Sequence, residues 1–298
     1  MIERIIVHTL VSGGVYAILA VGFSLIFGVA RVLNMAHTSF YALAAFGTFL
    51  LLSPVVGLEL AVAPSVIIII VVVGALGMLA YKLFINPVRE HHAAVLLITI
   101  ALAMIVEEIL VWRFGGQNRT IRFLVPGTVD IFGITIVNQN LLTLGVVAVT
   151  IVAVWLILSK TRLGIAIRAV ANDTEIAGLM GISASRVLMI TMGIASALAA
   201  IAGVVMAPLT TIVPTMWASP LMTTMVVVII GGLGSIKGSI IGAFILGFVS
   251  ALSVLDPLSL LRGGGAYLNM TFTLAAMVIV LIVRPGGLFG TLFEEEKL

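Results

Sequence analysis

The chain contains no cysteine, and only 9% of its 298 residues are charged. The absence of cysteine excludes a disulfide framework, a thiolate metal site and a cysteine nucleophile. The low charge excludes a soluble domain of this length, which would carry roughly a quarter charged residues. With 62% hydrophobic residues and a mean hydropathy of +1.32, the sequence instead indicates an all-α polytopic membrane protein.

Nine apolar segments are candidate membrane helices. Two of them, Ala36–Leu52 and Leu221–Gly231, are short for a hydrocarbon core of about 30 Å, so we expect them to be re-entrant or broken. The prediction is therefore one transmembrane domain, residues 1–298, with eight or nine transmembrane or broken helices. The other segments are Ile6–Gly28, Ala61–Tyr81, Ala93–Trp112, Leu141–Leu158, Leu188–Ala207, Ile240–Leu255 and Tyr267–Val283.

Two interruptions divide the apolar segments, one in each half of the chain: the polar stretch Arg31–Ser39 and the glycine-rich stretch Gly231–Ser239. One break per half suggests an internal inverted repeat, in which broken helices lie near the substrate site of a transporter. Polar groups at membrane depth are costly unless they meet protein, water or cargo. We therefore predict a translocation path lined by Asn34, His37, Ser39, Tyr41, Gly231, Gly232 and Gly234.

Each break also has a structural interpretation. His37 is equally consistent with a contact to cargo and with a histidine that binds a backbone carbonyl at the break. The glycines favour close helix packing around a bend over a lining role. A proton-coupled carrier would need carboxylates at the midplane, whereas Glu107 and Glu108 lie near the end of their segment, which favours solvation or pairing with arginine. The adjacent His91 and His92 are a weak metal signal, and we expect a plain loop there.

The loop Ser159–Val187 holds the densest charge, with four basic residues and two acids. Short loops rich in Lys and Arg lie on the cytoplasmic side. We therefore place this loop in the cytoplasm and the loop Arg113–Asn140 outside. The alternating run Val129–Val137 predicts a small external hairpin or cap.

A short helix is expected inside the cytoplasmic loop. Asn172 followed by Glu175 predicts a helix start of the capping-box type, and Gly181 predicts its end. The apolar residues Ile176, Leu179 and Met180 fall on one face. Because two turns are not stable alone in water, this helix must pack on its own chain, on lipid headgroups or on a soluble partner.

The stretch RAVANDTEIAGLMGI (168–182) resembles the ATPase-coupling loop of ABC importer permeases, in detail that of LivH-type permeases of branched-chain amino acid importers. RVLNMAHTSFY (31–41) resembles this family's Asn-x-Ala-His-Gly stretch, with Thr38 where the family commonly has glycine. GGLGSIKGSIIGAFILG (231–247) and RPGGLFG (284–290) are similar to two further stretches. The resemblance thus extends from residue 31 to residue 290.

The resemblance implies a permease subunit of an ATP-driven importer for branched-chain or other hydrophobic amino acids, in a bacterial or archaeal cytoplasmic (inner) membrane. The implied partners are a LivM-type permease or a second copy of this chain, two ATP-binding cassette subunits and an extracytoplasmic substrate-binding protein. ATP and magnesium would bind in the partners, and neither a catalytic role nor nucleic-acid binding is expected here. The implied ATPase-coupling residues are Asp173, Glu175, Ala177, Gly178 and Gly181.

Three alternatives stay open. Permeases of the same family also carry urea, amides or other small solutes. An ion-coupled secondary transporter would use His37 or Glu107 as its ionisable group. An intramembrane enzyme would use His37 with Ser39, but residues at i and i+2 point to different faces of a helix. No Walker A, G-x-S-x-G or H-E-x-x-H motif occurs in the sequence.

Overall fold

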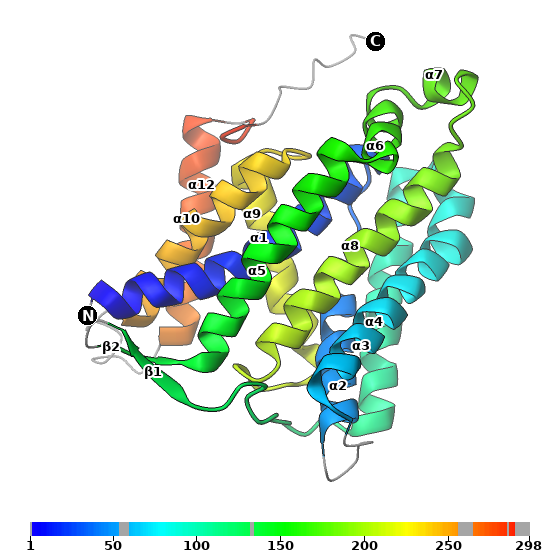
Figure 1. Cartoon of the computed structure of the whole chain (residues 1–298). Helices are drawn as coiled ribbons and strands as arrows, with labels where there is room; N and C mark the ends of the chain where they lie inside the picture. The colour runs from blue at the N-terminus through cyan, green and yellow to red at the C-terminus, as the bar shows by residue number, and fades with distance from the viewer. Residues whose placement is uncertain (1, 54–59, 132–133, 256–264, 285, 290–298) are drawn as a thin grey trace.

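The computed structural model describes residues 2–53, 60–131, 134–255, 265–284 and 286–289. Figure 1 shows a bundle of long helices gathered around α1, with a β-hairpin at one end. The helices are α1 (Ile2–Ala30), α2 (His37–Leu52), α3 (Val62–Ala80), α4 (His92–Phe114), α5 (Asn138–Lys160), α6 (Arg162–Asn172), α7 (Thr174–Leu179), α8 (Ala184–Met206), α9 (Ala218–Gly231), α10 (Ile236–Leu255) and α12 (Gly265–Val283).

Every predicted membrane segment lies in a helix. Within the described residues, six helical stretches are long and apolar enough to cross a membrane, and three shorter apolar helices accompany them, at 37–52, 236–252 and 271–283. The short α2 is one of these three, as expected. The other segment predicted to be short, Leu221–Gly231, belongs instead to the continuous stretch Pro214–Gly231, whose 18 residues are long enough to cross, because a 3-10 turn at Pro214–Trp217 runs directly into α9. The structure therefore confirms an all-α polytopic membrane protein.

The helix α1 forms the centre of the bundle, because 78% of its most apolar window is buried. The corresponding windows of α3, α4 and α5 are only 22–28% buried. Away from the helix ends, most of their exposed side chains are apolar, for example Val71, Leu97 and Val149. These helices therefore present an apolar surface to lipid, as spanning helices must.

The two charged loops lie at opposite ends of the bundle. The loop between α5 and α8, which carries α6 and α7, lies at one end, and the hairpin lies at the other (Figure 1). We call the first the basic end and the second the hairpin end. Among the described residues, the basic end carries nine Lys or Arg residues: Arg31, Lys82, Arg89, Lys160, Arg162, Arg168, Arg186, Lys237 and Arg284. The hairpin end carries Arg4, Arg113, Arg119 and Arg122. This asymmetry favours a cytoplasmic basic end.

The predicted hairpin is present. Strand β1 (Thr128–Ile131) pairs with β2 (Ile134–Val137) in antiparallel register, with Thr128 opposite Val137. The Thr135 hydroxyl donates to the Asp130 carboxylate at 2.6 Å across the pair. The alternation of side chains in the sequence was thus a reliable signal.

Candidate functional site

The break between α1 and α2 returns the chain deep into the bundle. Arg31 adopts a left-handed backbone conformation, with φ of 52°, directly after α1 ends. Further along, the His37 Nε2 lies 3.0 Å from the carbonyl oxygen of Leu19. Leu19 precedes Ala30 by eleven residues, which is about 16 Å along a helix. The helix α2 therefore begins near the middle of α1, not at the membrane surface.

Three polar side chains of this break, those of Asn34, His37 and Ser39, are buried and hydrogen-bonded within the chain. Asn34 and Ser39 are at most 2% exposed, and Tyr41 is 4% exposed. The Asn34 Oδ1 accepts from the Ala36 amide at 3.1 Å, and the Ser39 hydroxyl donates to the Ala36 carbonyl at 2.7 Å. These bonds satisfy backbone groups at the start of α2. The geometry therefore supports the structural interpretation of these residues, and the path-lining role stays a prediction.

His37 and Ser39 are bonded to different backbone carbonyls, of Leu19 and of Ala36. His37 also packs edge-on against the Phe23 ring, with centroids 6.0 Å apart. A hydroxyl activated by a neighbouring imidazole requires a direct hydrogen bond between the two groups. This arrangement gives no support to an intramembrane enzyme.

Replacing His37 with leucine should lower the melting temperature of the purified protein. The substitution removes the bond to Leu19 from a fully buried site, at a cost of about 1–3 kcal/mol. Thr38→Val is the matched control, because the buried Thr38 hydroxyl has no hydrogen-bond partner among the described residues. The control should melt no earlier than the wild type. An unchanged melting temperature in His37→Leu with loss of uptake would instead assign His37 to the path.

The glycines of the second break form the turn between α9 and α10 at the basic end. Gly232 and Gly234 have φ of 100° and 81°, a conformation that favours glycine. A Cβ on Gly238 would collide with the Gly231 carbonyl, and one on Gly234 would lie 3.3 Å from the Gly28 Cα of α1. The glycines therefore permit close backbone packing, and the geometry gives no evidence for a path along them.

The C-terminal glycine motif completes this turn. The amides of Leu288 and Phe289 donate to the carbonyls of Ile230 and Gly231, at 2.8 and 3.0 Å. A Cβ on Gly287 would lie 2.7 Å from the Gly232 Cα. The last carbonyls of α9, which have no partner within the helix, are thus covered by a segment about 55 residues later in the chain. Sequence reasoning identified both motifs but missed their contact.

The loop at the basic end contains a second helix, α6, that the sequence pattern did not separate from α7. Thr161 caps α6 by accepting from the Gly164 amide at 3.1 Å. The face of α6 bearing Gly164, Ile167 and Val170 is buried. The Thr161-x-x-Gly164 spacing and the apolar pair three residues apart were the available signals.

The start of α7 corrects the predicted capping residue. Asn172 is the last residue of α6, and Asp173 is the N-cap of α7. The Asp173 Oδ1 accepts from the amides of Glu175 and Ile176, at 2.8 and 2.9 Å. The capping-box start at Asn172 was wrong by one residue, because α6 continues to that position. The predicted end is confirmed, since Gly181 has φ of 81°.

The helix α7 is held by one side chain and exposes the others. Ala177 is 3% exposed, whereas Leu179 and Met180 are 87% and 79% exposed. A Cβ on Gly178 would meet no atom within 4 Å. In Figure 1 α7 projects beyond the bundle at the basic end. Two of the predicted coupling residues thus have different roles: Ala177 anchors the helix to the bundle, whereas Gly178 is exposed. Leu179 and Met180, which were not in that set, are exposed beside Gly178.

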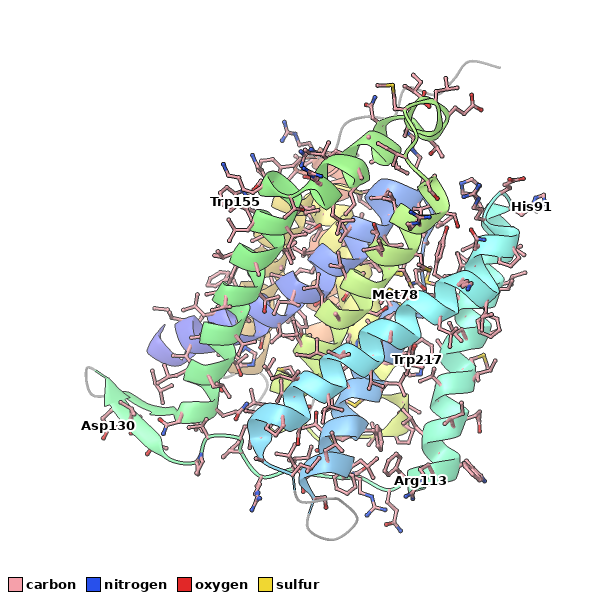
Figure 2. All side chains as sticks on the ribbon, turned by 45° about the vertical axis from the view of Figure 1, so that its right-hand side comes forward. Met78, His91, Arg113, Asp130, Trp155 and Trp217 are labelled. Atoms are coloured by element: carbon pink, nitrogen blue, oxygen red, sulfur yellow. The ribbon has the colours of Figure 1, made fainter. Side chains whose placement is uncertain are left out.

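Glu107 was a candidate for ion coupling, and His91 and His92 were a weak metal signal. The structure supports neither role. The Glu107 carboxylate accepts a 2.6 Å hydrogen bond from the indole of Trp217, which Figure 2 labels in the bundle. Among the described residues, no group of three or more His, Asp or Glu side chains could hold a metal ion. Figure 2 places His91 at the end of the bundle, where a plain loop was expected.

Comparison with known proteins places the chain in a family. Residues 5–287 match the model described as the permease component of the branched-chain amino acid transport system. The LivH permease of Salmonella typhimurium is 27% identical over 302 residues, covering 96% of this chain and 94% of that one. The probable LivH of Methanocaldococcus jannaschii is 24% identical, covering 99% and 95%.

A solved structure has the same fold. PsaBC from Streptococcus pneumoniae, in complex with Fab, matches 97% of this chain and 98% of its own, with a TM-score of 0.54 and 15% identity. The helical arrangement is therefore shared by a protein of only 15% sequence identity. Together with the match over residues 5–287, the apolar helices identify this multi-pass membrane protein as a member of the branched-chain amino acid transport permease family.

Proposed function

We propose that this chain is the permease subunit of an ATP-driven ABC importer that carries branched-chain or other hydrophobic amino acids across a bacterial or archaeal inner membrane. The observation that carries the proposal is α7, which the chain anchors through Ala177 and leaves otherwise exposed. The name of the Salmonella typhimurium relative, a LivH permease of high-affinity branched-chain amino acid transport, supports the cargo.

Under this proposal the chain supplies the membrane path and its partners supply the energy. The basic end faces the cytoplasm, where Leu179 and Met180 dock on an ATP-binding subunit. The hairpin end faces outward, toward a substrate-binding protein. A second permease, either related or identical, completes the path. This chain performs no covalent chemistry, and ATP and magnesium bind in the ATPase partners.

The test uses the chain with its encoded partners, in a host that lacks its own branched-chain amino acid uptake. Labelled leucine, isoleucine and valine should accumulate when the proton gradient is collapsed and ATP is kept. Accumulation should stop when ATP is depleted. Uptake that stops when the proton gradient is collapsed and continues when ATP is depleted would establish a secondary transporter. If unlabelled urea or acetamide inhibited the uptake of labelled leucine and unlabelled valine did not, the cargo would be reassigned. The permease role would be unaffected.

A further inference from the structure

An apolar cavity of about 380 Å³ opens on the side of the bundle between α1, α5 and α10. We call it the α1/α5/α10 groove. Buried Val21 of α1 and Val154 of α5 form its floor, Ile240 of α10 forms one wall, and Val152 and Trp155 of α5, 54% and 58% exposed, form the other. Its volume falls within the range of about 300–1,000 Å³ that small-molecule sites occupy.

The end of this groove is cationic. Arg168 of α6 and Lys237 of α10, both exposed, line it at the basic end beside Ser159. The guanidinium of Arg168 donates to the Leu158 carbonyl, which holds the side chain over the end of α5. A guanidinium has five N–H donors, so this bond leaves others available. No acidic residue is among the described residues that line the groove.

The groove opens on the lipid-facing side of the bundle, and this position indicates which kind of molecule can bind there. It lies on α5, whose exposed face is apolar, so lipid chains reach it sideways (Figure 2, where Trp155 marks this face). A water-soluble anion could bind the two cations but would leave the apolar walls uncovered. A molecule with an apolar chain and an anionic head matches both parts.

From this match we infer that the α1/α5/α10 groove binds one anionic phospholipid. An acyl chain lies against Val21, Val152 and Ile240, and the phosphate lies between Arg168 and Lys237. The lipid comes from the leaflet at the basic end, which is the cytoplasmic leaflet in the orientation proposed above. The bound lipid would link α6, and through it the α7 helix, to α10.

The charge of the site is tested by native mass spectrometry of the full-length protein. Wild-type protein released from mixed micelles should retain phosphatidylglycerol in preference to phosphatidylcholine, and excess inorganic phosphate should not displace it. Lys237→Gln should weaken retention about fivefold, because one interfacial cation contributes about that factor. Arg186→Gln, an exposed cation of the same end outside the groove, is the matched control and should retain lipid as the wild type does.

The apolar part is tested by filling the groove. Val152→Trp should displace the lipid, whereas Val149→Trp, on the same helix at 70% exposure but outside the groove, should not. Equal retention of both lipids, or full retention in both Lys237→Gln and Val152→Trp, would overturn the inference. So would a crosslink from a cysteine at Val152 to a second permease, which would show protein in the groove. These experiments measure lipid retention, whereas the permease proposal is tested by amino acid uptake, so either one can fail without the other.

Discussion

Replacing Leu179 with aspartate should abolish ATP-driven uptake and leave the membrane bundle intact. Leu179 is 87% exposed on α7, so the substitution costs the isolated chain little. In the proposed complex the same side chain enters an apolar contact with the ATPase, where a buried carboxylate is strongly unfavourable. Central interface residues of this kind are worth about 2 kcal/mol or more, and we expect uptake to fall by at least tenfold. Uptake in membrane vesicles and the amount of co-purified ATPase provide the measurements.

Thr174→Asp is the control for this experiment. It introduces the same charge one turn earlier on α7, at an exposed position where the helix N-terminus favours an acid. The control should transport normally. Normal uptake and normal ATPase retention in Leu179→Asp would show that α7 is not the docking surface.

Gly238→Ala should prevent the permease from assembling. The added Cβ collides with the Gly231 carbonyl, which is backbone and cannot move aside as a flexible side chain would. Separating α9 from α10 would also strain the bonds from Leu288 and Phe289, which cover the end of α9. Overpacking of this severity belongs to the most destabilising class of single substitutions. The measurement is the yield of monodisperse protein after detergent extraction, which should fall to near zero.

Gly145→Ala is the matched control, because Gly145 lies inside α5 and an added Cβ there meets no atom within 4 Å. Alanine is the better helix former by about 1 kcal/mol. The yield of this variant should equal or exceed that of the wild type. A normal yield from Gly238→Ala would mean that the α9–α10 turn can open without loss of the fold.

The membrane helices were predictable because each is a local property of the sequence. In lipid, an apolar run of about 20 residues can satisfy its backbone hydrogen bonds within one segment only as a helix. The segment Leu141–Leu158 was therefore expected to be helical, and it lies in α5. The hairpin was predictable for the same reason, from the alternation in Val129–Val137. Both signals lie within one stretch of chain.

Features that depend on distant contacts were not predictable. Polarity showed that Asn34 and His37 need partners, but not that Ala36 and Leu19 would provide them inside the chain. The packing of Gly287 on Gly232 joins two motifs whose spacing carries no signal. Asp173 replaced Asn172 as the N-cap only because Ile167 and Val170 dock α6 onto the bundle and extend it to residue 172.

The deep start of α2 has a consequence for how the protein is made. Buried Phe40 and Tyr41 belong to the same cluster as Leu198 and Val205, and α2 packs most extensively on α8. The ribosome must add roughly 150 residues after α2 before α8 is complete, which at about 5–20 residues per second takes on the order of 10–30 s. During that interval α3, which follows α2 directly in the chain, is available to pack on it, but the side of α2 that packs on α8 has no partner. We therefore expect a chain that stops before α8 to expose the buried surface of α2 and to be degraded faster than the full-length protein.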